Sequence, residues 1–231
     1  MKLIKNIYIA LTLITLTSCG ELFTFEEAKP IPEGVLLSHH EVDLILGDSI
    51  LLETYINPDT VEVSYHWEVY DDVEAVQLIG RRVYANKPGR AKVVVETKGY
   101  DSDNLPIVFT DSCFVNVFEW KDIDPDEYLY ETVVYASLTI DNELLTDSMG
   151  DTRLVAIVDG EKRGEAVMRT AHEIPYLEMR ISATWPGESA EIQCYHRQTR
   201  ERFVFESLPL TGNTYGTLSK LKTYRTISRK Q

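Results

Sequence analysis

The chain has 231 residues, and 37 acidic against 23 basic side chains give it a formal net charge of −14 at pH 7. This acidic balance argues against nucleic acid as a partner, because its phosphates would repel the chain, and against adsorption on an anionic lipid surface. The length is sufficient for two domains of about 100 residues each.

The first twenty residues follow the order of an export signal. Lys2 and Lys5 precede an apolar stretch at residues 7–16, and small polar residues then lead to Cys19. This order is typical of a secretory signal, and about ten apolar residues are too few to span a bilayer, which needs roughly 20. We therefore predict a signal peptide at residues 1–18.

Residues 16–19, with the sequence LTSC, resemble the bacterial lipobox. The resemblance implies that the chain is cleaved before Cys19 and that the thiol of Cys19 carries a diacylglycerol. Two or more acyl chains hold a protein on a membrane almost permanently. Residues 20–34 contain two prolines, two glycines and four glutamates, so we predict a lipidated tether at residues 19–34.

Short alternating runs, separated by turn residues, fill the next segment, from residue 35 to residue 119. The runs are 42–46, 50–56, 64–69, 82–85, 91–96 and 113–118. Strands of this length at this spacing indicate an antiparallel β-sandwich or barrel. No stretch has sustained helical periodicity.

Several landmarks within residues 35–119 resemble the bacterial Ig-like domains of group 2. They are Leu46-Gly47-Asp48, Pro58-Asp59, Trp67, Val76 with Gly80, Val83-Tyr84-Ala85, Pro88-Gly89-Arg90-Ala91, and Cys113-Phe114-Val115-Asn116-Val117. The resemblance implies a structural module of adhesins and surface proteins, with Trp67 in its core and no reaction of its own. Residues 99–111 depart from the family as a longer and more acidic loop.

A change in composition marks the end of this first module. Residues 120–127 contain five charges and a proline between apolar runs, and we predict that they form a linker. Residues 128–140 then have the pattern of a long strand, and Asp159-Gly160 is a favoured hairpin turn. We predict a second sandwich at residues 128–231, so the expected fold class is all-β, with two Ig-like antiparallel β-sandwich domains.

The second segment is similar to a β module that recurs in surface and secreted proteins of Bacteroidetes. An A-x-V-x-G-x-x-R-G hairpin matches residues 156–164, and a Tyr-x-x-x-Thr-Gly turn matches residues 195–200. The chain departs from the module at Lys162, where cysteine is common, and at Arg200, which replaces the turn glycine. The resemblance implies an outer-membrane lipoprotein at the cell surface, although a periplasmic orientation stays open.

Two cysteines remain once Cys19 is set aside. An exported protein could join Cys113 and Cys194 in a disulfide. Each lies in its own apolar alternating run, however, and these runs fall in different predicted domains. We therefore expect two free, buried thiols.

Candidate catalytic and metal sites are weak. The acidic residues at 122–127 resemble the start of a calcium loop but lack its glycine and its final acid, and we interpret them as a solvated linker. His39 and His40 are adjacent, so on a strand they would point to opposite faces. No G-x-S-x-G nucleophile motif is present. We predict no catalytic residues, no metal and no cofactor.

Aromatic side chains are the more informative set, with 13 tyrosines and three tryptophans. Trp185 lies beside Pro186-Gly187 at a predicted hairpin tip, where an aromatic ring can stack on a sugar or anchor a protein interface. The alternative is a ring folded onto its own sheet. We predict Trp185, Tyr176 and Tyr215 as contacts for a ligand or partner.

The resemblances together imply a non-enzymatic, membrane-anchored surface lipoprotein that acts in binding or scaffolding. In bacteria of this group, lipoproteins with Ig-like domains often accompany TonB-dependent transporters and companion lipoproteins in the uptake of glycans or peptides. We expect such a role here. An adhesin or fimbria-type subunit, which would exchange strands between chains, is the alternative. An uncharacterised hydrolase is a further rival.

Overall fold

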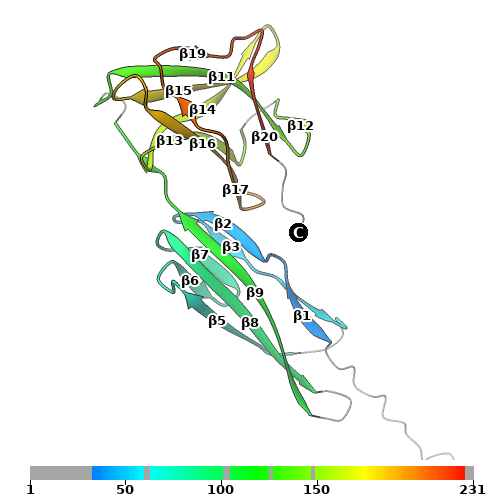
Figure 1. Ribbon diagram of the computed structural model, residues 1–231. Coiled ribbons are helices and arrows are strands. Elements are labelled where there is room, and N and C mark those ends of the chain that lie inside the picture. Colours follow the sequence, from blue (N-terminus) through cyan, green and yellow to red (C-terminus); the bar gives the residue numbers. More distant parts are fainter. Residues whose placement is uncertain (1–32, 60–62, 101–104, 125–126, 147–148, 227–231) are drawn as a thin grey trace, which may run out of the picture.

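The computed structural model describes residues 33–59, 63–100, 105–124, 127–146 and 149–226. The predicted signal peptide, Cys19 and nearly all of the predicted tether lie outside these residues. Strands dominate the described chain and form two bodies that follow one another in sequence (Figure 1). We call the sheets of residues 34–118 the proximal domain and those of residues 121–226 the distal domain. None of the described ranges contains a helix long and apolar enough to cross a membrane.

The proximal domain is a β-sandwich. Its strands are β1 (Gly34–Leu37), β2 (Glu41–Ile45), β3 (Ser49–Leu51), β4 (Thr54–Asn57), β5 (Tyr65–Asp71), β6 (Val76–Ile79), β7 (Arg82–Ala85), β8 (Gly89–Tyr100) and β9 (Pro106–Phe118). One sheet has the order β2-β9-β8-β5, a second has the order β3-β7-β6, and β1 pairs with β4. The β2–β9 pair is parallel, and the other pairs are antiparallel.

Alternation along these strands creates the proximal core, because successive side chains point to opposite faces of a sheet. Val93 and Val95 of β8 and Cys113 and Val115 of β9 are fully buried. Trp67 is partly buried and packs against this core, in agreement with the role that the family resemblance implied.

Two predictions for the proximal domain differ from the structure. The predicted strand at 50–56 is two strands, since β3 pairs with β7 whereas β4 pairs with β1, and the chain changes sheet at the fully buried Leu52. The predicted loop at 99–111 is largely strand. Residues 106–111 extend β9 opposite β8, and the partly buried Phe109 packs on the core.

The distal domain is a larger, folded sheet. Its strands are β10 (Lys121–Asp122), β11 (Tyr130–Ile140), β12 (Glu143–Leu144), β13 (Thr152–Val158), β14 (Glu161–Ala171), β15 (Ile174–Ala183), β16 (Ser189–His196), β17 (Glu201–Val204), β18 (Leu208–Pro209), β19 (Thr214–Tyr215) and β20 (Lys222–Thr226). Their main order is β12-β11-β15-β14-β13-β16-β17, and β19 and β20 add in parallel to β11. The predicted face of Val134, Ala136 and Leu138 is buried, and Ile140 packs against the same core.

The sheet folds on itself at β14. Residues 161–165 of this strand pair with β13, whereas residues 166–171 pair with β15. Asp159 and Gly160 both have positive φ, which is the geometry of a type I′ hairpin turn. At the fold, a Cβ on Gly164 would lie 2.5 Å from the carbonyl oxygen of Arg180. The glycine of the R-G pair is therefore required for the close packing of the two strands.

The segment predicted as a linker, 120–127, is integrated into the fold at its start. Trp120 is buried, and β10 lies parallel to β14. Lys162, at the position where the module that the sequence resembles commonly has cysteine, bonds Asp122 at 2.6 Å and Glu165 at 2.9 Å. These contacts hold the connection against the distal sheet. Pro125 and Asp126 lie outside the described residues.

Candidate functional site

The best-defined site lies where the two domains meet. Its centre is an aromatic and aliphatic cluster of Phe118, Trp120, Val155, Ile157 and Tyr195, against which Ile45 packs. The Phe118 ring lies 5.3 Å from that of Trp120 and 5.2 Å from that of Tyr195, between centroids. Such tilted and edge-on pairs add to the stabilisation from burial alone. The junction therefore has a small hydrophobic core of its own.

Cations and a buried amide surround this core. Arg202 lies over the Phe118 ring at 4.6 Å, and Arg153 lies over the Trp120 ring at 4.9 Å. The indole nitrogen of Trp120 donates to Oε1 of the buried Gln193 at 2.9 Å. Each polar edge of the cluster thus has a partner, as buried polar groups require.

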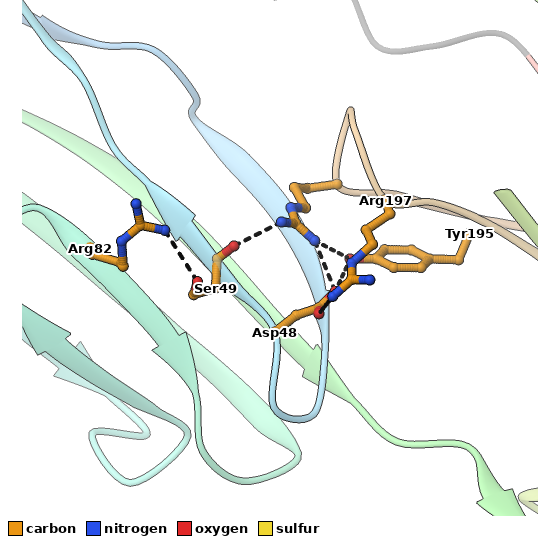
Figure 2. Close-up of polar contacts among 6 residues, drawn as sticks. Asp48, Ser49, Arg82, Tyr195 and Arg197 are labelled. Carbon is orange, nitrogen blue, oxygen red and sulfur yellow. Dashed lines mark hydrogen bonds and ion pairs between the residues drawn. The ribbon is translucent and has the colours of Figure 1, made fainter. Parts of the chain in front are cut away.

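Asp48 is the electrostatic centre of the junction. It follows Gly47 in the β2–β3 turn of the proximal domain, and its side chain is 7% exposed. Arg197 donates to Oδ1 at 2.6 Å and Arg200 donates to Oδ2 at 2.8 Å, both from the hairpin between β16 and β17 (Figure 2). The hydroxyl of Tyr195 adds a longer contact at 3.4 Å. A single proximal carboxylate therefore binds three distal side chains.

The turn that carries Asp48 is held by its main chain. The amide of Gly47 donates to the carbonyl of Ala85 at 3.0 Å, and the amide of Ala85 donates to the carbonyl of Asp48 at 2.8 Å. Arg82 also donates to the hydroxyl of Ser49 at 3.3 Å (Figure 2). The carboxylate is consequently preorganised on the proximal domain before the distal hairpin binds it.

Arg200 is held in a costly backbone conformation. Its φ is 57°, in the left-handed region, which costs a residue with a side chain about 1–2 kcal/mol. Its guanidinium bonds Asp48 and also the carbonyl of Ser49 at 2.9 Å. Arg200, which stands where the similar module has its turn glycine, is therefore one of the residues that contact the neighbouring domain.

Two hydrogen bonds to Asp43 continue the junction along β2. The amide of Asp43 donates to the carbonyl of Arg200 at 2.7 Å, and the amide of Arg202 donates to Oδ2 of Asp43 at 3.0 Å. Asp43 is 3% exposed and also accepts from Asn116. One of these bonds joins two main chains and the other ends on the Asp43 carboxylate, and together they hold the hairpin against β2.

Two shallow hollows flank the junction. One, of about 280 Å³, is lined by Leu46, Asp48, Asp151 and Arg197 among others. The other, of about 390 Å³, is lined by Glu119, Asp159, Glu191 and Arg202 among others. Acidic and basic side chains line both hollows, and in the first one Arg197 is paired with Asp48. This ion pair joins the two domains.

A second ionic cluster supports the junction from the distal side. Arg153, which stacks on Trp120, donates to Glu165 through Nε at 2.7 Å and Nη2 at 2.9 Å. These hydrogen bonds, with a further one from Lys162, lower the pKa of Glu165 to about 2. The carboxylate is therefore ionised at neutral pH.

The three predicted contact residues do not form one site. Trp185 is 57% exposed in the β15–β16 turn. Tyr176 lies near the start of β15, nine residues away, which is about 30 Å along a strand. Its ring packs edge-on to Tyr135 at 5.8 Å. Tyr215 packs against the distal core and donates to the carbonyl of Pro209 at 2.6 Å.

Three of the histidines have ordinary structural partners. His40 lies beside Asp111, and His66 lies beside Glu68. The buried His196 has hydroxyls at both ring nitrogens, from Thr152 at 3.1 Å and Thr226 at 3.0 Å. Among the residues that the structure describes, no group of three His, Cys, Asp or Glu side chains could hold a metal ion.

The two cysteines lie in separate domains, Cys113 in β9 and Cys194 in β16. Both are free and buried, as the sequence pattern predicted. Burial raises the pKa of each thiol to about 12. Neither is therefore poised as a nucleophile, because the thiolate is the reactive form.

Comparison with known proteins gives similarity of fold only. No family model and no curated protein matches the chain. It is similar to Bacteroides ovatus mixed-linkage glucan utilization locus SGBP-B in complex with a mixed-linkage heptasaccharide. The match has 11% identity, covers 78% of this chain and 48% of that one, and has a TM-score of 0.24. The tandem Ig repeats of Dlar match at 8% identity, over 84% of this chain and 98% of that one, with a TM-score of 0.25.

The N-terminal four Ig domains of Dscam1 isoform 6.9 match at 12% identity, over 85% of this chain and 53% of that one, with a TM-score of 0.25. The chain thus spans about half of the Bacteroides and Dscam1 chains. The sheets described above give the fold directly, as all-β with Ig-like antiparallel sandwiches. Likenesses at these scores say nothing about what the chain binds.

Proposed function

We propose that this chain is a non-enzymatic, lipid-anchored surface protein in which the proximal domain is a spacer and the distal domain makes the contact. The observation that carries the proposal is the junction. Domains joined by a linker move relative to one another by default unless their interface is large or apolar. Here an aromatic core, a buried carboxylate and a main-chain hydrogen bond join them.

The position of the chain's start supports the role of a spacer. β1, where the described chain begins, lies toward the end of the proximal domain away from the distal domain (Figure 1). An anchor on Cys19 would thus hold the proximal domain near the membrane and the distal domain away from it. A fixed junction would then present the distal surface at a defined height, which lowers the entropy lost when a partner binds.

The finer assignment rests on sequence. Its lipobox and Bacteroidetes-like module favour an outer-membrane accessory of a TonB-dependent transporter, with companion lipoproteins, in the uptake of a glycan or peptide. The test is purification of the tagged, lipidated chain from its own outer membrane in gentle detergent. A stoichiometric transporter would support the proposal. Recovery of the chain alone would contradict it. The control is Cys19→Ala, which should leave the membrane fraction if the chain is anchored through this cysteine.

One observation favours the alternative of an adhesin or fimbria-type subunit. Residues 166–171 of β14 pair with β15 on one side, and no described residue pairs with their other edge. A hollow of about 700 Å³ beside this edge is lined by Met149 and residues 165–170. An open edge is a template for a strand from another chain. A ladder of self-assemblies in the same purification would support this alternative.

A further inference from the structure

One edge of β14 is open along residues 166–171. β15 pairs with these residues on one side of the strand, whereas β13, on the other side, reaches only as far as Glu165, which pairs with Val155. No described residue pairs with residues 166–171 on that second side. We call this stretch the 166–171 edge.

Main-chain donors and acceptors point out of this edge. The turn at His172-Glu173, where both residues have positive φ, joins β14 to β15 in a two-residue hairpin, in which the pair that flanks the turn is hydrogen-bonded. Hydrogen-bonded and non-hydrogen-bonded pairs alternate along an antiparallel ladder. The residues that direct their N–H and C=O groups away from β15 are therefore Ala166, Met168 and Thr170. An extended segment beside the edge would bond these groups.

The space beside the edge is closed at one end. A hollow of about 700 Å³ is lined by Met149 and residues 165–170. Val155 of β13 occupies the position beside Glu165 at the start of this hollow, and the edge ends at the turn after residue 171. The space therefore accommodates an added strand of about six residues, which must end or bend away at Val155.

The same edge of a second copy does not fit this space. If residues 166–171 of two copies paired with one another in antiparallel register, residue 172 of the second copy would lie opposite Glu165 of the first. Val155 already pairs with Glu165 on that side. The edge is therefore suited to a short segment of another protein rather than to its own counterpart.

Side chains at the edge indicate how the segment alternates. Met168 and Met149 line the hollow and pack, partly buried, against the distal core. Inward side chains of an added strand would cover these flexible thioethers, which adapt to apolar groups of different shapes. The opposite face of the edge carries Val167, which is 48% exposed, and Arg169. A segment with apolar residues at alternate positions would therefore fit.

Arg169 favours an acid in the segment. Its side chain is 55% exposed, and its Nε lies 4.0 Å from Oε2 of Glu178, at the limit of an ion pair. The other carboxylate oxygen of Glu178 accepts from Arg180 at 2.9 Å. A guanidinium has five N–H donors, so Arg169 can also bind a carboxylate on an added strand, where opposite charges that face each other attract.

We propose that the 166–171 edge binds a short extended segment of a partner protein as an added strand, with apolar side chains over Met149 and Met168 and a carboxylate beside Arg169. This inference rests on the proposed function and names the way in which the distal domain holds its partner. It assigns the edge to a different protein, whereas the adhesin alternative assigns it to another copy of this chain.

The first step of the test identifies the segment. The lipidated full chain carries Val167→p-benzoylphenylalanine as photocrosslinker in its own cells, and the matched control carries it at Val204, which is 54% exposed on β17 of the same domain. We expect one segment of one other protein, with alternating apolar residues and an acid, to be crosslinked from position 167 and not from position 204.

The second step titrates a synthetic peptide of that segment onto the purified full chain. Met168→Pro should weaken binding by roughly tenfold, because it removes an N–H that points out of the edge. Arg169→Glu should weaken it by roughly threefold or more through charge, and this exposed position tests the edge even if Met168→Pro fails to fold. Arg225→Glu, the same change at an exposed arginine of β20, should leave binding unchanged.

Hydrogen exchange distinguishes an added strand from contact through side chains alone. The bound peptide should slow exchange at the amides of Met168 and Thr170, which then gain a partner. Exchange at the amide of Arg169 should not change, because the hairpin register directs this amide to β15.

Each other outcome overturns the inference in a different way. Crosslinking to residues 166–171 of a second copy would replace it with the adhesin alternative. If a partner co-purifies but is not crosslinked from position 167, or if the peptide binds both variants equally or leaves Met168 and Thr170 unprotected, the edge is not the contact, although the proposed function stands. If the unchanged chain recovers no partner, the proposed function fails and the inference fails with it.

Discussion

Arg200 shows how one residue can link conformational strain to a contact between domains. A glycine at this hairpin position would adopt a φ of 57° without strain, but it would lose every bond that the guanidinium makes to Asp48 and Ser49. The chain therefore has a strained backbone at this position, and in return it gains side-chain contacts with the proximal domain.

The first prediction separates these two effects of Arg200. Arg200→Ala should lower the free energy of unfolding by about 3 kcal/mol, because it keeps the strain and removes a partner of a buried carboxylate. Arg200→Gly should be less destabilised than Arg200→Ala by about 1 kcal/mol, because glycine relieves the left-handed backbone. Urea unfolding of both variants checks this order. Equal stability would show that the backbone at this position is unstrained.

The second prediction concerns Gly164 at the fold of β14. Gly164→Ala should destabilise the chain by about 1–3 kcal/mol, because the added Cβ would lie 2.5 Å from the carbonyl oxygen of Arg180 and backbone must move. Gly34→Ala is the matched control, since no atom lies within 4 Å of a Cβ built there. Thermal unfolding of both variants compares them, and a similar shift for the two would refute the steric argument.

At the scale of the element, His196 connects four strands of the distal domain. The ring extends from β16 and bonds Thr152 at the start of β13 and Thr226 at the end of β20. Its edge-on packing against Phe203 adds β17. Burial lowers the pKa of His196 below its ordinary value of 6.5, and the nearby charges of Glu201 and Asp141 oppose this shift.

The third prediction follows from that pKa. Below pH 6.5 the unfolded chain binds a proton that the folded chain resists, so stability that is present above this pH is lost as the pH falls. We expect a loss on the order of 1 kcal/mol between pH 7.5 and pH 5.5. This range lies above the titration of Glu165. In urea unfolding at both values, His196→Gln should reduce the loss, whereas His66→Gln, on the exposed face of β5, should keep it.

Local sequence patterns predicted most strands but not all of their ends. The face of Val134, Ala136 and Leu138 follows from alternation alone, and the Asp159-Gly160 turn follows from the need for positive φ. The change of sheet at Leu52 has no local signal, because an apolar run continues through it. The long β8–β9 hairpin was hidden by acidic residues that suggested a loop.

At the scale of the whole molecule, the junction was beyond the reach of local patterns. Asp48 and Arg200 are separated by 152 positions, and nothing in either segment specifies the other. Two departures from the module that the sequence resembles were the available signals. Arg200 in place of glycine and Lys162 in place of cysteine both make contacts at or beside the junction.

The fourth prediction tests whether the junction fixes the two domains. Spin labels at Ile79→Cys and Ile174→Cys, both 57% exposed in the native chain, should give one narrow interdomain distance in pulsed electron paramagnetic resonance. Adding Asp48→Asn and Trp120→Ala should broaden it, because the buried carboxylate and the aromatic core are then both lost. Adding Trp185→Ala should not. A broad distribution in the otherwise unchanged chain would show that the domains are independent.

The docking of Arg200 on Asp48 has a consequence for how such proteins can recombine. Each half of the contact is costly alone, since a separated proximal domain would expose Phe118 and a separated distal domain would keep a strained arginine without its carboxylate. A recombinant protein that joined either domain to a foreign neighbour would contain only one side of the contact between Asp48 and Arg200. The pair should therefore pass between genomes as a single unit, and its two halves should change together.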